Sequence, residues 1–110
     1  MTRWIFISDG YPHLDISTPG IDANTKDAVT DFLTTDIGRG IRNIASYRER
    51  WKKACDGELN SVLGNGTEQE LEGDRVRLES LYEQWETVYF TVPEFEELLD
   101  DYAAFVKDAD

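Results

Sequence analysis

The junction near residue 91 is the feature that most limits how this chain can fold. Thr91 and Glu94 stand at the spacing at which a helix N-cap and the third helical residue exchange hydrogen bonds. Phe90 and Phe95 flank them at the spacing of a hydrophobic staple, and Pro93 suits a first helical turn, where its missing N–H costs nothing. The β-branched and aromatic run before Thr91 therefore predicts a strand that passes directly into a helix.

The helix predicted after this junction is amphipathic. Apolar residues recur at helical spacing and predict a buried stripe, formed by Phe95, Leu98, Leu99, Tyr102 and Val106. Acidic residues fill the remaining faces, namely Glu94, Glu96, Glu97, Asp100, Asp101 and Asp108. We expect the stripe to cover a sheet and the carboxylates to face solvent.

Two groups of strands are predicted upstream. The first is an N-terminal hairpin of residues 4–7 and 13–16, with its turn at Asp9-Gly10 and with Pro12 placing the second strand at an edge. The second is a three-stranded antiparallel meander, in which β-type segments cover residues 67–71, 75–78 and 85–90. Gly64-Asn65-Gly66 and Glu72-Gly73-Asp74 supply the turns.

The segment between these groups has helical periodicity. A short helix is expected after Asn24, and residues 34–36 resemble a second N-cap. A long amphipathic helix is then expected from residue 37 to a stop near Asp56-Gly57, with Trp51 in the core and the basic residues at 48–53 paired with the acidic half. The predicted architecture is α+β, with helices packed on one face of antiparallel sheet, in a single domain covering residues 1–110.

The net charge of −12 lies entirely in the C-terminal half. Residues 1–56 hold eight acidic and eight basic side chains, whereas residues 57–110 hold fifteen acidic and three basic ones. A field of one sign repels nucleic acid and anionic membranes and attracts basic partners, although acidity also serves solubility alone. We therefore expect a basic protein partner and no direct binding to nucleic acid or membrane.

The residues that carry catalysis or bind metals are scarce. One histidine, His13, and one cysteine, Cys55, cannot form a structural zinc site or an intramolecular disulfide, and no nucleophile motif surrounds either residue. No apolar run reaches the roughly 18 residues that span a bilayer. We expect a cytoplasmic, non-enzymatic protein without metal or cofactor, and the roles of His13 and Cys55 and the oligomeric state stay open.

Carboxylates next to aromatic side chains mark the predicted contact surface. The main patch comprises Glu70, Glu72, Asp74, Glu83, Trp85 and Glu86, and a second patch comprises Glu97 and Asp101. Trp and Tyr are enriched at interface hot spots, so Trp85 and the nearby Tyr82 are candidate anchors, but both equally suit a core.

Two segments resemble the C-terminal part of small bacterial immunity proteins. They are Gly66 to Leu78 and the pattern Val92-Pro93-x-Phe95-x-x-Leu98-Leu99-x-x-Tyr102-x-x-Phe105-Val106. These proteins are partners of polymorphic toxins, including those of contact-dependent growth inhibition. The resemblance implies a protein that binds and neutralises a cognate toxin, commonly a basic nuclease domain. An inhibitor that covers a cationic groove needs no chemistry of its own.

Two other classes of function remain as alternatives. An acidic nucleic-acid mimic or adaptor would occupy a DNA-binding host protein through its carboxylates, and would compete with DNA. A small enzyme or ligand-binding domain would need a concave pocket with convergent polar groups, to which no motif in this sequence points.

Overall fold

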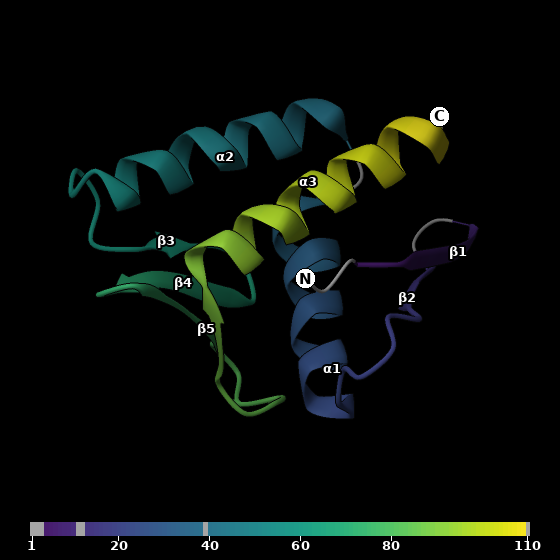
Figure 1. Ribbon diagram of the computed structural model, residues 1–110. Helices are drawn as coiled ribbons and strands as arrows, with labels where there is room; N and C mark the ends of the chain where they lie inside the picture. Colours follow the sequence, from purple (N-terminus) through teal and green to yellow (C-terminus); the bar gives the residue numbers. More distant parts are fainter. Residues whose placement is uncertain (1–3, 11–12, 39, 110) are drawn as a thin grey trace.

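The computed structural model describes residues 4–10, 13–38 and 40–109 (Figure 1). Its elements in chain order are β1 (Phe6–Gly10), β2 (His13–Ile16), α1 (Ala23–Asp31), η1 (Phe32–Ile37), α2 (Ile41–Cys55), β3 (Val62–Leu63), β4 (Thr67–Glu72), β5 (Arg75–Ser80), β6 (Val88–Thr91) and α3 (Val92–Ala109). The strands form two antiparallel sheets, β1-β2 and β3-β4-β5-β6. The predicted α+β class is confirmed.

The larger sheet contains the predicted meander and one additional strand. β3 pairs with β4 through only two residues, Val62 and Leu63, and so short a segment leaves no alternating pattern in the sequence. The predicted third strand is shorter than expected, because β6 begins at Val88 and Trp85 lies in the loop before it. Burial alternates along the strands, so that Val76 and Leu78 face the helices while Arg77 faces away.

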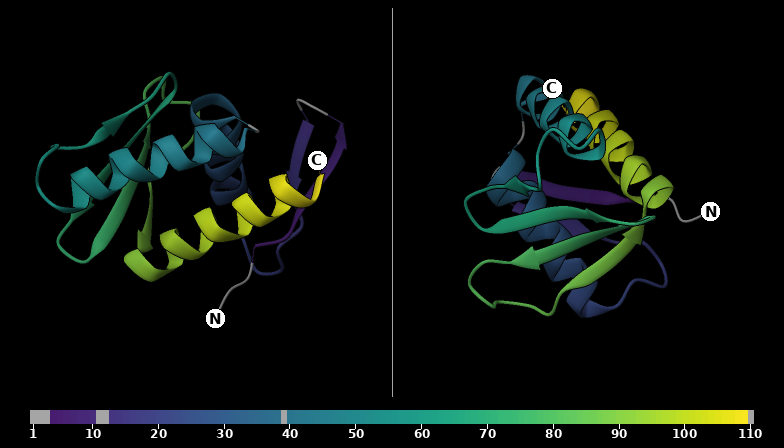
Figure 2. Two further views of the ribbon diagram at one scale, coloured as in Figure 1. Left: turned by 90° about the horizontal axis from the view of Figure 1, so that it is seen from above. Right: turned by 90° about the vertical axis from the view of Figure 1, so that its left-hand side faces the viewer.

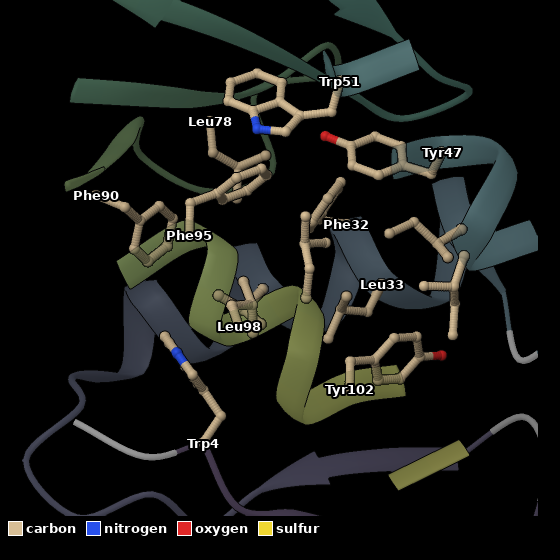
Figure 3. Close-up of a cluster of buried hydrophobic side chains, with 14 of the residues drawn as sticks. Trp4, Phe32, Leu33, Tyr47, Trp51, Leu78, Phe90, Phe95, Leu98 and Tyr102 are labelled. Atoms are coloured by element: carbon tan, nitrogen blue, oxygen red, sulfur yellow. The ribbon is translucent and has the colours of Figure 1, made fainter. Parts of the chain in front are cut away.

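The helices cover one face of this sheet, as expected. Figure 2 shows α2 and α3 side by side over the strands, and α1 packs beneath them against β5. Phe95 of α3 lies at the centre of the core, with its ring centroid 5.7 Å from that of Phe32 and 4.9 Å from that of Trp51 (Figure 3). The whole predicted stripe of α3 is buried.

The junction of β6 and α3 has the predicted capping box. The Thr91 N–H donates to Glu94 Oε1 at 2.8 Å, and the Glu94 N–H donates to Thr91 Oγ1 at 3.2 Å. The rings of Phe90 and Phe95 lie 6.1 Å apart, as the staple requires. The strand therefore continues into the helix without an intervening loop.

The N-terminal hairpin forms its own sheet and packs against α1 and α3. Phe6 contacts the rings of Tyr102 and Phe105 at centroid distances of 5.6 and 5.7 Å. Gly10 pairs with His13, so Asp9 and Gly10 belong to the strand and not to the expected turn. The prediction for Pro12 lies outside the described residues.

The first helix differs from its prediction at both ends. Asp22 and not Asn24 is the N-cap, because Asp22 Oδ1 accepts from the Thr25 N–H at 2.7 Å. No new cap forms at residues 34–36; α1 runs on as the π-helical segment η1 and stops at Gly38, whose φ is 81°. The Asp36 carboxylate is not available as a cap because it binds the start of β4.

Helix α2 begins at Ile41, later than expected, and ends at Cys55, with Gly57 at a φ of 84° beyond it. Its basic side chain Arg48 forms ion pairs with Glu96 at 3.2 Å and Asp100 at 2.7 Å, joining α2 to α3 as expected. Within the described residues, no helix combines the length and the apolar character needed to cross a lipid bilayer.

Candidate partner-binding site

The loop between β5 and β6, residues 81–87, presents the most exposed aromatic side chain among the described residues. Tyr82 is 68% exposed and its neighbour Leu81 is 38% exposed. Glu83 and Glu86 are exposed on the same loop, and Glu79 is half-buried just before it. None of these three carboxylates forms an ion pair with a described residue, so their charges are uncompensated locally.

Hydrogen bonds from several elements fix the backbone of the 81–87 loop. Ser80 Oγ accepts from the N–H groups of Tyr82 and Gln84 at 3.3 and 3.0 Å. Asn24 forms two bonds with the Glu86 backbone, donating to its carbonyl at 2.9 Å and accepting from its N–H at 2.8 Å. A loop fixed in this way loses less conformational entropy when a partner binds.

Trp85 anchors the loop to the rest of the molecule. Its indole N–H donates to Asp31 Oδ2 at 3.0 Å, and its half-buried ring packs against the hydrophobic core. Trp85 therefore holds the loop in place, and Tyr82 is the aromatic residue that a partner can reach.

Glu83 has an unusual backbone conformation. Its φ of 55° places it in the left-handed region, and it is the single described non-glycine residue found there. This conformation costs on the order of 1 kcal/mol for a residue with a Cβ. It also sets the direction of the chain at the exposed tip of the loop.

The loop borders two open hollows. The larger, of about 860 Å³, is lined by Asn24, Glu79, Ser80, Leu81, Glu83, Gln84, Trp85, Glu86 and Thr87. A second, of about 580 Å³, lies towards α1 and shares Gln84 and Trp85 with the first. In Figure 1 this loop reaches from the end of β5 to the start of α1. Three carboxylates, Glu79, Glu83 and Glu86, thus line one open cleft.

The predicted main patch is divided between two surfaces. Glu83, Trp85 and Glu86 come together on the loop, but Glu70 and Glu72 lie on the outer face of the sheet. There they surround Arg77, which lies 2.6 Å from Glu70 and 3.2 Å from Glu72. These carboxylates are partly neutralised within the molecule. Asp74 is exposed in the β4–β5 turn.

The predicted second patch is also divided. Asp101 Oδ2 accepts from the backbone N–H of Trp4 at 2.9 Å and so holds the chain just before β1 against α3. Glu97 is half-buried and lines a separate small pocket with Trp4 and Phe90. One residue is therefore structural, and the other faces a cavity.

Four residues that shape the site lie outside the predicted patch, namely Asn24, Glu79, Leu81 and Tyr82. The sequence instead favours Asn24 as a helix cap, because Asn is frequent there. Tyr82 is a candidate anchor from its residue type, but its exposure depends on how the loop folds. The pairing of Glu70 with Arg77 can be predicted from the sequence, because a two-residue turn between β4 and β5 fixes this register.

Cys55 lies away from the loop, at the end of α2. Burial, together with the nearby carboxylate of Glu96, raises the pKa of its thiol, which lowers the thiolate fraction near neutral pH. The described residues contain no group of three or more His, Cys, Asp or Glu side chains placed to hold a metal ion.

Comparison of this chain with models of protein families, with curated proteins and with solved structures gave no match.

Proposed function

We propose that this chain is an immunity protein that binds a basic protein toxin through the 81–87 loop and neutralises it. The observation that carries the proposal is an exposed apolar and aromatic pair, Leu81 and Tyr82, on a hydrogen-bonded loop with unpaired carboxylates at Glu83 and Glu86. Interface hot spots are enriched in Tyr and become buried when the partner binds, and a polar rim surrounds them.

Charge supports the choice of a basic partner. Residues 57–110 hold fifteen acidic and three basic side chains, and this half contains the loop. Complementary charge raises the association rate constant of two proteins. In strongly charged pairs this constant reaches about 10⁸ M⁻¹s⁻¹ or more at low salt. A nuclease domain carries cationic surface to hold phosphates, and covering that surface blocks it without catalysis by the inhibitor.

A nucleic-acid mimic or adaptor is the alternative. Such a protein needs carboxylates in place of phosphates, whereas an exposed Tyr82 beside Leu81 adds apolar contact that a phosphate backbone does not provide. The loop therefore favours recognition of a folded protein surface, and the two proposals differ in what Tyr82 contributes.

Affinity capture from a bacterial strain that encodes this chain tests the proposal. The tagged wild-type protein is compared with the loop variant Tyr82→Ala/Glu83→Lys/Glu86→Lys and with the control Glu49→Lys/Glu58→Lys, whose exposed positions on α2 and just after it give the same change of charge. We expect the wild type and the control to retain one basic domain and the loop variant to lose it. When that domain is expressed in cells together with one form of this chain, the wild type and the control should protect the cells and the loop variant should not.

Three results would contradict the proposal. Equal capture by the loop variant would exclude the loop as the contact surface. Capture of a housekeeping DNA-binding protein that DNA displaces would favour the mimic. Capture of a basic domain that does not harm cells would exclude immunity.

A further inference from the structure

A small pocket lies beside the candidate site, between β6, the start of α1 and the first turns of α3. Its volume is about 160 Å³, and its walls include the side chains of Trp4, Tyr89 and Phe90. Trp4 and Phe90 meet edge to face with 6.2 Å between their ring centroids (Figure 3). Glu94 and Glu97 line the same pocket from α3.

Two polar groups at this pocket lack partners within the described chain. Glu97 is half-buried and forms neither a hydrogen bond nor an ion pair with a described residue. Trp4 is only 7% exposed, and no described residue accepts a hydrogen bond from its indole N–H. The indole N–H is not fully buried, so water can reach it, and a ligand that offers both a positive charge and an oxygen acceptor would pair with Glu97 and replace that water.

The electrostatic field at the pocket favours a cation. Glu94 and Glu97 contribute two negative charges, which the N-terminus of α3 offsets by about half a charge and the guanidinium of Arg75, held over the Tyr89 ring, offsets further. Aromatic ring faces add attraction for a cation, most strongly for a planar guanidinium. The molecule already contains one such contact, because the guanidinium of Arg75 lies 4.4 Å from the ring centroid of Tyr89.

The pocket and the candidate site share no lining residue, but they are lined by neighbouring residues of α1 and of the chain that leads into β6. Asn24, in the first turn of α1, lines the large cleft of the 81–87 loop, and the next residue, Thr25, lines this pocket. Glu86 and Thr87 border the cleft, and Tyr89 borders the pocket two residues further along. A partner seated on the loop would therefore extend over the pocket.

We propose that this pocket binds an arginine side chain of the partner, with the guanidinium paired to Glu97 and packed against the aromatic walls. The assignment of the arginine to a partner rests on the proposed function. The chemistry of the pocket does not, because a free arginine derivative can occupy it without any partner protein.

Nuclear magnetic resonance titration with N-acetyl-arginine-methylamide tests the pocket directly. This probe carries the guanidinium and two carbonyl acceptors, and the indole N–H resonance of Trp4 reports on its binding. We expect a saturable shift with a Kd on the order of 1–10 mM, since the probe is small. The citrulline derivative, which is neutral and nearly isosteric, should bind at least about fivefold more weakly.

Matched variants connect the binding to named groups. Glu97→Gln should weaken arginine binding about fivefold and leave citrulline binding unchanged, whereas Glu58→Gln, with the same loss of charge at an exposed position just after α2, should change neither. Any of three results would overturn the proposal. The shift could be linear without saturation, the citrulline derivative could bind as tightly as the arginine derivative, or a lysine derivative could bind as tightly as the arginine derivative.

The same variants separate this inference from the proposed function. If the 81–87 loop captures a toxin but the titration shows no saturable binding, the pocket proposal alone fails. If arginine binds with dependence on Glu97 but no toxin is captured, the pocket stands as a guanidinium site and the immunity proposal fails.

Discussion

Asp36 joins the π-helical segment η1 to the larger sheet through a network of polar groups. Its carboxylate accepts from the N–H groups of Gly66 and Thr67 at 2.8 and 2.9 Å, and from the Thr67 hydroxyl. The network continues through Gln69 to the buried hydroxyl of Tyr47. Because Thr67 and Gln69 are buried, these groups depend on one another for hydrogen bonds.

Replacing Asp36 should therefore be costly. Asp36→Ala leaves backbone and hydroxyl donors without their acceptor, and we expect a loss of about 2 to 4 kcal/mol in the free energy of unfolding. Urea denaturation measures this loss. Asp27→Ala, an exposed position on α1, is the control and should change stability little.

Gly64 supplies an independent check of the same contact. A Cβ at this position would overlap the Asp36 carboxylate, so Gly64→Ala should destabilise the wild type. The same substitution should cost less in the Asp36→Ala background, where the space is free. Strictly additive effects would mean that the two residues do not meet in solution.

Tyr47 should make stability depend on pH in the alkaline range. Burial raises the pKa of its phenol well above the usual value, with the Arg50 charge opposing the rise and Asp36 adding to it. The unfolded chain releases this proton near pH 10, whereas the folded chain keeps it, so stability is fully present below about pH 10 and falls as the pH rises further. The slope is at most about 1.4 kcal/mol per pH unit.

The variant Tyr47→Phe isolates this contribution. The stability difference between wild type and variant should be constant between about pH 7 and pH 9 and should shrink above about pH 10, where the other tyrosines contribute equally to both proteins. Chemical denaturation across this range measures it. Parallel curves up to about pH 11 would show that the Tyr47 hydroxyl is accessible to solvent.

At the level of elements, the 81–87 loop depends on α1 for its conformation. Asn24 forms both of the hydrogen bonds that join α1 to the Glu86 backbone. In Asn24→Ala, amide hydrogen exchange should become faster across the loop, above all at Glu86, while protection in β4 and β5 stays unchanged. If the proposed interface is correct, the dissociation rate from the partner should also rise, because the loop must be ordered on binding.

The control for this experiment is Asn43→Ala, at an exposed position on α2 far along the chain from the loop. It should leave exchange in the loop unchanged. Equally fast exchange in Asn24→Ala and wild type would mean that Ser80 and Trp85 suffice to hold the loop.

Local signals account for the elements that the sequence predicts correctly. The capping box at Thr91, the alternation at Arg75–Leu78 and the end of α2 near Gly57 all arise within a few residues of chain. The missed features depend on distant partners. η1 continues past Thr34 because Asp36 binds β4, and Tyr82 is exposed because Trp85 bonds to Asp31 from another element. No pattern local to these residues contains that information.

At the level of the whole molecule, the unequal distribution of charge should make stability depend on salt. The fifteen acidic residues in the C-terminal half share it with only three basic ones, so repulsion among them opposes folding. At an ionic strength of about 0.01 M the Debye length is about 30 Å, comparable with the molecule's extents of 37 × 30 × 29 Å, so almost all of these charges interact.

We expect the melting temperature to rise by several degrees between about 0.01 M and 0.5 M sodium chloride, as the Debye length falls below about 10 Å. Thermal unfolding followed by circular dichroism measures this. A falling melting temperature would mean that the ion pairs of Arg48 and Arg77 outweigh the repulsion.

The contact between Trp4 and Asp101 bears on when this protein can fold during its synthesis. These two residues are separated by 97 positions, and Phe6 likewise packs against Tyr102. At translation speeds of roughly 5 to 20 residues per second, the first strand waits on the order of 5 to 20 s for the helix that covers it. The contacts of the first strand are therefore incomplete until α3 has left the ribosome, and under the proposed function protection of a cell would begin only after that delay.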